Sequence, residues 1–175
     1  MTTAADLESA GVPPFGDPCE ELFDGHFWGL VRLASLLGAD DPEDVVQEAF
    51  VRLHRKGHAL RDPDAALAYL RSTVCNLNRN RLRHLRMARR HHRHLAAETE
   101  ISSAESSVVH NESVRELLAA LTRLPRRQRE VIVLRYWLDL TERETAETLN
   151  VALGTVKAHA ARAIATLNTR LKEPK

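Results

Sequence analysis

Hydrophobic residues recur with helical spacing along most of the chain, and no stretch shows the strict alternation of a half-buried strand. The first periodic segment ends at Gly38, and the pairs Asp41-Pro42 and Asp62-Pro63 open the next two, because Asp is a good N-cap and Pro a good first-turn residue. The pattern predicts an all-α protein. The expected helices cover about 20–37, 42–56, 63–86, 113–123, 126–137, 142–149 and 155–171.

Two segments lack this periodicity. Residues 1–19 contain prolines and glycines without an apolar repeat, which is typical of a disordered tail. Residues 88–112 are dominated by charge, Ser and His, as in a flexible linker. We therefore expect two small helical bundles, over 20–87 and 113–172, joined by this linker.

The second expected helix has an acidic outer face. From 17 to 48, nine acidic residues and one arginine give a net charge of −8. An apolar side chain, Val51, stands among the charges opposite the buried stripe, as a protein contact would require. A solvated face is the alternative. The candidate residues are Asp44, Gln47, Glu48, Val51 and Arg55.

The third expected helix carries the opposite charge. Residues 71–94 include eight arginines and no acid, so they repel one another unless an anion is near. Arginines at positions i, i+4 and i+7 can follow phosphates, and asparagines can bond to base edges. A solvated arginine face is again the alternative. The candidate nucleic-acid residues are Ser72, Asn76, Arg79, Asn80, Arg83 and Arg86.

A helix-turn-helix pattern follows in the second bundle. Thr141 and Glu144 match a capping box, the short helix ends near Asn150, and a helix with small outward residues comes next. Short side chains let a helix enter the major groove, although alanines are also simply good helix formers. The candidate residues are Thr155, Lys157, Ala158, His159 and Arg162.

These motifs carry a family resemblance. Leu124-Pro125, Arg129-Glu130-Val131 and Gly154-Thr155-Val156-Lys157 resemble region 4 of bacterial sigma factors of the extracytoplasmic-function (ECF) group, although LuxR-type regulators share similar motifs. The sequence DPEDVVQEAFVRL, at 41–53, resembles region 2 of the same family, which LuxR-type proteins lack. Together the two segments cover about 21–87 and 113–171.

The resemblance implies a function for each face. The acidic helix would dock on the clamp helices of the polymerase β′ subunit, the arginine-rich helix would bind the −10 element and its melted strand, and the last helix would bind the −35 element. Contact with the β flap and control by an anti-sigma protein are also implied. The family places a base pocket in the loop at 57–62. Departures from the pattern occur at His54, Asn80, Thr145, Ala152, His159 and Ala160.

Other functions remain to be weighed. A stand-alone LuxR-like transcription regulator is the main alternative. No nucleophile–base pair or phosphate loop indicates an enzyme or a cofactor. The cluster His84, His91, His92 and His94 has poor spacing for a tetrahedral metal site. Two distant cysteines, Cys19 and Cys75, and the lack of a signal or membrane-spanning run favour the cytoplasm, with a disulfide between them as the alternative.

Overall fold

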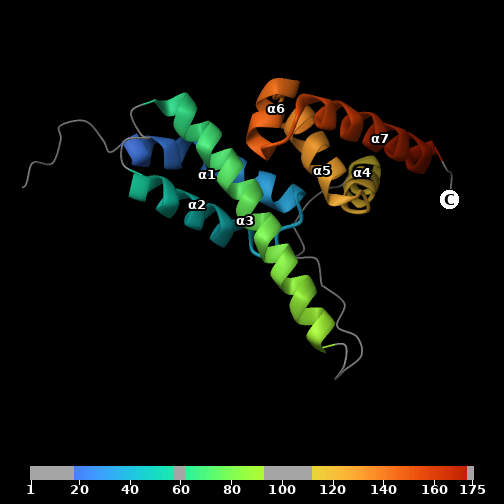
Figure 1. The fold of residues 1–175 in the computed structure, drawn as a ribbon, viewed down its shortest axis with the longest axis horizontal. Helices are drawn as coiled ribbons and strands as arrows, with labels where there is room; N and C mark the ends of the chain where they lie inside the picture. Colours follow the sequence, from blue (N-terminus) through green and yellow to red (C-terminus); the bar gives the residue numbers. More distant parts are fainter. Residues whose placement is uncertain (1–17, 57–61, 93–111, 173–175) are drawn as a thin grey trace, which may run out of the picture.

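The computed structural model describes residues 18–56, 62–92 and 112–172, and every regular element in these ranges is helical (Figure 1). The linker was expected over 88–112, but residues 88–92 are helical and continue the third helix to His92, because no Gly or Pro interrupts this stretch. Residues 1–17 of the expected tail, the loop around 57–61 and the rest of the expected linker over 93–111 lie outside the described residues. The all-α prediction is confirmed. The elements are α1 (Pro18–Leu36), α2 (Pro42–Lys56), α3 (Pro63–His92), α4 (Glu112–Thr122), α5 (Arg126–Ile132), η2 (Val133–Trp137), α6 (Glu142–Leu149) and α7 (Leu153–Lys172).

Helices α1, α2 and α3 form the first bundle, and their starts follow the predicted rules. The Asp41 carboxylate accepts a hydrogen bond from the Asp44 amide at 3.0 Å, which caps α2. Asp62 accepts one from the Asp64 amide at 3.1 Å at the start of α3. The predicted stripe of α2 is buried and packs with leucines of the other two helices. The largest fully buried side chains here include Leu33, Leu37, Leu53, Leu70, Val45, Val46 and Val74.

The second bundle contains the predicted helix-turn-helix. Thr141 and Glu144 form the expected capping box, with the Glu144 carboxylate accepting from the Thr141 amide at 2.7 Å. Asn150 ends α6 in the left-handed conformation, at φ 51°. These two devices fix where α6 begins and ends, and so orient α7.

The segment after α5 departs from the prediction. An α-helix over the whole of 126–137, as the periodicity predicts, would turn Tyr136 or Trp137 inward, but both are exposed, at 63% and 50%. The reason is η2, a π-helical turn in which the Leu138 amide donates to the Val133 carbonyl at 3.2 Å. The wider turn rotates the later residues away from the α-helical positions that we assumed. Leu134 and Leu140 take the inward places.

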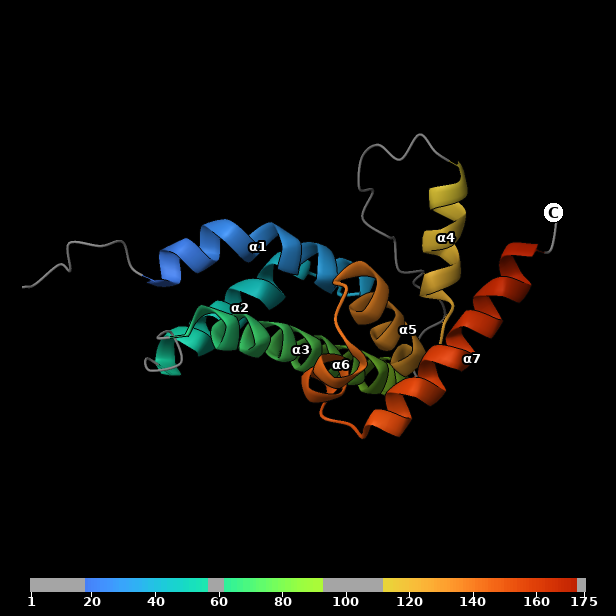
Figure 2. The same ribbon diagram turned by 90° about the horizontal axis from the view of Figure 1, so that it is seen from above.

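The two bundles share one hydrophobic core. Leu134, Leu140 and Leu149 of the second bundle belong to the same contiguous cluster of buried residues as Leu33 and Leu70 of the first. Seen from above, α6 lies beside α3, and α5 lies near the end of α1 (Figure 2). The last turns of α3 extend beyond both bundles (Figure 1).

A second, smaller cluster belongs to the C-terminal bundle alone. It contains Leu121, Leu124, Ile132 and Ala163. Much of the apolar surface of this bundle is therefore covered by the first bundle and not by itself. None of the helices in the described ranges is long and apolar enough to cross a bilayer.

Candidate nucleic-acid interface

Helix α7 presents its predicted cations to solvent. The Lys157 side chain is 59% exposed, and its Nζ lies 3.7 Å from Glu142 Oε2 on α6. Arg162 is exposed, whereas Thr155, Ala158 and His159 are half-buried. Among the described residues, the Nδ1 atom of His159 is buried and has no hydrogen-bond partner. The surface that can face a polyanion is thus built around Lys157 and Arg162.

Helix α7 starts without a side-chain N-cap, at Ala152, one of the positions where the sequence departs from the family pattern. Ala152 has no side chain that could cap the helix, and only its backbone carbonyl accepts, from the amides of Thr155 and Val156 at 2.9 and 3.3 Å. Thr145, the other departure nearby, is fully buried, and its hydroxyl has no partner in the described structure. The hydroxyl therefore adds desolvation cost at a place where an apolar side chain would pack.

The predicted residues of α3 do not lie on one open face. Asn76, Asn80 and Arg83 are exposed, Ser72 is half-buried, and the Arg79 side chain is only 20% exposed. Arg79 donates from Nη1 to Asn76 Oδ1 at 3.1 Å. The Arg86 side chain lies outside the described part of the structure. The arginine-rich face is consequently open at Arg83 and covered near Arg79.

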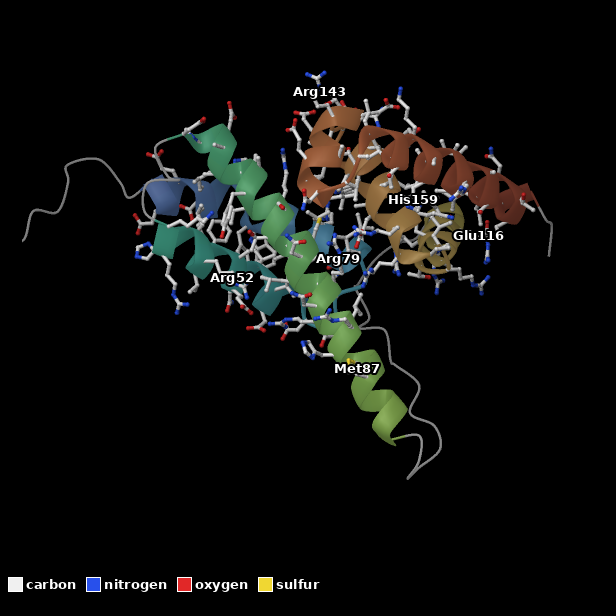
Figure 3. All side chains as sticks on the ribbon, in the orientation of Figure 1. Arg52, Arg79, Met87, Glu116, Arg143 and His159 are labelled. Atoms are coloured by element: carbon white, nitrogen blue, oxygen red, sulfur yellow. The ribbon has the colours of Figure 1, made fainter. Side chains whose placement is uncertain are left out.

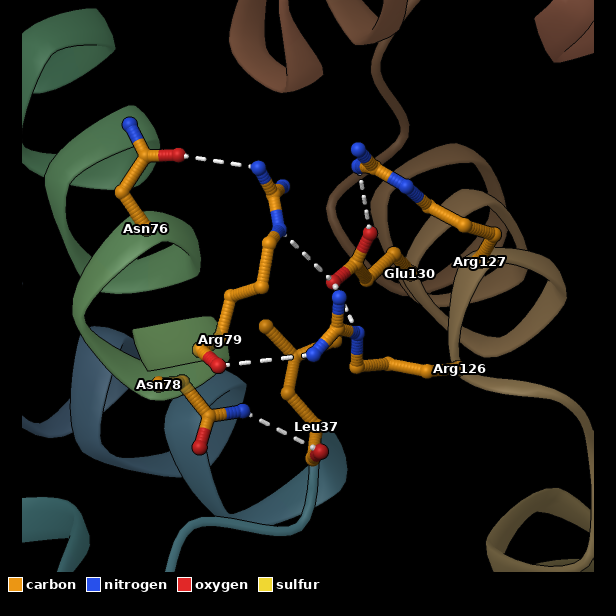
Figure 4. A network of polar contacts seen from close by, with 7 residues as sticks. All are labelled: Leu37, Asn76, Asn78, Arg79, Arg126, Arg127 and Glu130. Atoms are coloured by element: carbon orange, nitrogen blue, oxygen red, sulfur yellow. Dashed lines mark hydrogen bonds and ion pairs between the residues drawn. The ribbon is translucent and has the colours of Figure 1, made fainter. Parts of the chain in front are cut away.

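The cover comes from α5 of the second bundle. Glu130, whose side chain is 3% exposed, places its Oε1 atom 3.5 Å from Arg79 Nε and 3.5 Å from Arg126 Nε. Its Oε2 atom accepts from Arg127 Nη1 at 2.9 Å. Arg126 Nη1 also donates to the Arg79 carbonyl at 3.4 Å (Figure 4). Nothing in the sequence periodicity links Glu130 to α3, so sequence reasoning missed this contact.

A polar cavity of about 510 Å³ opens between α3 and α6. Ser72 and Arg71 line it from α3, and Glu144 and Glu147 line it from α6. Burial lowers the pKa of the Arg71 guanidinium, against the opposing effect of the Glu144 and Asp64 carboxylates. The mixture of charges gives this cavity no clear preference for an anion.

The acidic face of α2 is organised by an arginine that we did not predict. Asp44, Gln47, Val51 and Arg55 are exposed, and Glu48 is half-buried. Arg81 of α3 forms an ion pair with Asp44, and its Nη2 atom lies 3.5 Å from Glu48 Oε2. The hydrogen bond to Asp44 raises the pKa of the Arg81 guanidinium. Glu48 also pairs with Arg52 at 2.6 Å.

Comparison with known proteins identifies the family. A model of sigma-70 region 2 matches residues 29–94, and a model of sigma-70 region 4 matches residues 114–167. The chain belongs to the sigma-70 family. It is an ECF-type RNA polymerase sigma factor, a protein of transcription initiation. The region 2 match separates it from the stand-alone LuxR-like regulators considered above.

Similar proteins in actinobacteria support this placement. The chain is 32% identical to an RNA polymerase sigma-E factor of Streptomyces avermitilis over 145 residues, which cover 82% of this chain and 79% of that protein. It is 32% identical to the ECF sigma factor SigM of Mycobacterium tuberculosis over 166 residues, which cover 93% and 82% of the two chains.

Two solved structures share the fold. The sigma factor RpoE of Bartonella quintana, in complex with the anti-sigma factor NepR, aligns with a TM-score of 0.71 at 21% identity and covers 89% of this chain and 98% of that one. CnrH, in complex with the cytosolic domain of CnrY, aligns with a TM-score of 0.57 at 26% identity and covers 87% and 86%.

Proposed function

We propose that this sigma factor uses three separate surfaces to bring RNA polymerase to a promoter. The first is the outer face of α2, with Val51 at its centre, which would bind the clamp helices of the β′ subunit. The second is the arginine-rich face of α3, which would hold the −10 element, and the third is the N-terminal half of α7, which would bind the −35 element. Contact between the second bundle and the β flap belongs to the same proposal.

The exposure of Val51 is the observation that carries the polymerase assignment. Its side chain is 48% exposed between charged neighbours on a helix whose opposite side is fully packed. An apolar side chain ringed by polar groups is the usual composition of a protein-binding centre. The ion pairs of Arg81 with Asp44 and Glu48 support the assignment, because they hold the two carboxylates beside Val51 in fixed positions.

Substitution of Val51 tests this surface. We expect Val51→Asp to weaken binding to purified core polymerase by about tenfold or more, the typical loss when a central contact is removed. Leu171→Asp is the matched control, because Leu171 is also 48% exposed but lies at the far end of α7. Binding by fluorescence anisotropy and run-off transcription from a mapped promoter are the measurements. Equal affinities for the two variants would exclude the α2 surface.

An anti-sigma protein is a further expected partner. The two solved relatives, RpoE and CnrH, are described in complex with NepR and CnrY, which supports the same kind of control here. The chain would act by binding and not by catalysis, in the cytoplasm where the polymerase works. Transcript-start mapping after overexpression would supply the promoter sequences that the DNA-binding tests require.

A further inference from the structure

The contact between the two bundles contains a buried carboxylate beside its apolar part. Apolar contacts involve Leu140 and Leu149, which join the core of the first bundle. At the edge, Arg32 of α1 stacks over the Trp137 ring at 5.8 Å. Glu130 lies at the centre of the polar part, with its side chain almost fully removed from water. One charged group is therefore buried at the polar part of an otherwise apolar contact.

The three arginines around Glu130 are not equivalent. Arg126 and Arg127 stand four and three residues before it on its own helix, so they remain close whatever the first bundle does. Arg79 comes from α3 and is the one partner that separation of the bundles would remove. Because Glu130 keeps two cations, opening leaves no lone buried charge, and the contact can break reversibly.

The Arg79 guanidinium is ion-paired, but some of its N–H donors have no hydrogen-bond acceptor in the part of the chain that the structure describes. Its Nε and Nη2 atoms are buried and have no hydrogen bond within the described residues, although the carboxylate of Glu130 lies within ion-pair distance of Nε. A guanidinium with unused donors has binding capacity left for an anion such as a phosphate. In the present arrangement, Glu130 and α5 stand where that anion would have to approach (Figure 4).

We propose that Glu130 and Arg79 form an intramolecular latch that keeps the −10 surface of α3 closed in the free protein. The latch opens when polymerase draws the two bundles apart, and Arg79 then exchanges the Glu130 carboxylate for promoter phosphate. The second half of this statement rests on the proposed function of α3, whereas the first half concerns the free protein alone.

Cys75 is a natural probe for separation of the two bundles. Cys75 lies on α3 one turn before Arg79 and is fully buried, and burial together with the Glu130 carboxylate raises the pKa of its thiol to about 12. The only other cysteine is Cys19. In a Cys19→Ser background, the rate of thiol labelling by iodoacetamide therefore measures how often the region around Cys75 becomes accessible.

Two variants break the latch from opposite sides. Glu130→Gln removes the charge from α5, and Arg79→Gln removes it from α3 without touching the arginines of the second bundle. We expect both to speed the labelling of Cys75 about tenfold, since each removes a charge-assisted contact. Arg79→Gln is the decisive variant, because loss of Glu130 also lowers the pKa of the thiol directly, whereas loss of Arg79 raises it and would by itself slow labelling. Glu116→Gln on α4, an exposed carboxylate of the same bundle (Figure 3), is the control and should not change the rate. Circular dichroism verifies that each variant remains folded.

DNA binding separates the two halves of the proposal. A fluorescent oligonucleotide carrying the −10 strand of a mapped promoter should bind free Glu130→Gln more tightly than free wild type, while the two holoenzymes should bind it equally. Labelling rates equal to the Glu116→Gln control for both variants would overturn the latch. Faster labelling with unchanged −10 binding by the Arg79→Gln holoenzyme would keep the latch in the free protein and exclude Arg79 as a DNA contact.

Discussion

Helices α3 and α7 are both assigned to DNA, yet they stand in opposite situations. Helix α7 lies at the edge of the molecule with Lys157 and Arg162 facing solvent. Helix α3 is packed against α1 and α2 on one side and against α6 on another, and Arg79 is ion-paired to Glu130. Only its last turns extend beyond the bundles (Figure 1).

The difference shows that charge on a helix does not by itself indicate an open binding surface. Both helices are basic in sequence, but a cation held by a buried carboxylate, as Arg79 is by Glu130, is less available to DNA than Lys157, whose ion pair with Glu142 is exposed to solvent. In this arrangement the proposed −35 surface is accessible and part of the proposed −10 surface is not. On these proposals, we expect the free protein to contact DNA first through α7.

The largest effect should come from the core beneath α3. Leu70→Ala removes a fully buried side chain, and we expect a loss of about 2–5 kcal/mol in the free energy of unfolding. The same change at Leu167, half-buried on α7, should cost about 2 kcal/mol or less. Urea denaturation followed by circular dichroism measures both. Equal losses would contradict the contrast between a central and a peripheral helix.

A smaller effect is expected on the open surface of α7. Arg162→Ala should weaken binding of the holoenzyme to a −35 fragment about tenfold, and Lys157→Ala should reduce the salt slope of binding by about 1. Arg115→Ala, an exposed arginine on α4, is the control and should leave both quantities unchanged. The accessible −35 surface would be wrongly placed if the α7 variants bound like this control. Anisotropy titrations over a range of salt concentrations supply the data.

The smallest effect concerns α6, the helix between α3 and α7. Thr141→Ala should cost about 1 kcal/mol of stability by removing the N-cap. Hydrogen bonds from Thr141 lower the pKa of Glu144, so their contribution is complete above the ordinary glutamate value of 4.5 and is lost as the pH falls through the lowered value.

Acid titration checks this capping box. Thr141→Ala should reduce the dependence of stability on pH below about 4.5, where the wild type loses the Glu144 interaction. Thr169→Ala on α7 is the control, because the Thr169 hydroxyl bonds only to the Ala165 carbonyl within its own helix. A steeper acid loss in Thr141→Ala than in the control would refute the role of the box.

Helix boundaries and inward faces could be read from the sequence because their causes are local. The caps at Asp41 and Asp62, the box at Thr141 and the left-handed Asn150 all involve residues within a few positions of one another. The π-turn at Val133–Trp137 was missed, since nothing in the apolar spacing distinguishes it from an α-helix.

The contacts between distant segments could not be read in the same way. The pairing of Arg79 with Glu130 and that of Arg81 with Asp44 join residues 51 and 37 positions apart, counting from their numbers in the chain. Periodicity assigned Arg79 to an outer face, which is correct for α3 alone. The second bundle then covers this face, a relation that depends on tertiary packing and not on either segment separately.

The stacking of Arg32 on Trp137 has a consequence for optical measurements. The chain has two tryptophans, Trp28 and Trp137, and only the indole of Trp137 rests against the opposite bundle. Indole emission depends on nearby charge, so a Trp28→Phe protein would carry a single intrinsic fluorophore at the boundary between the bundles. Stopped-flow mixing with polymerase could then follow the separation in real time, without an added dye.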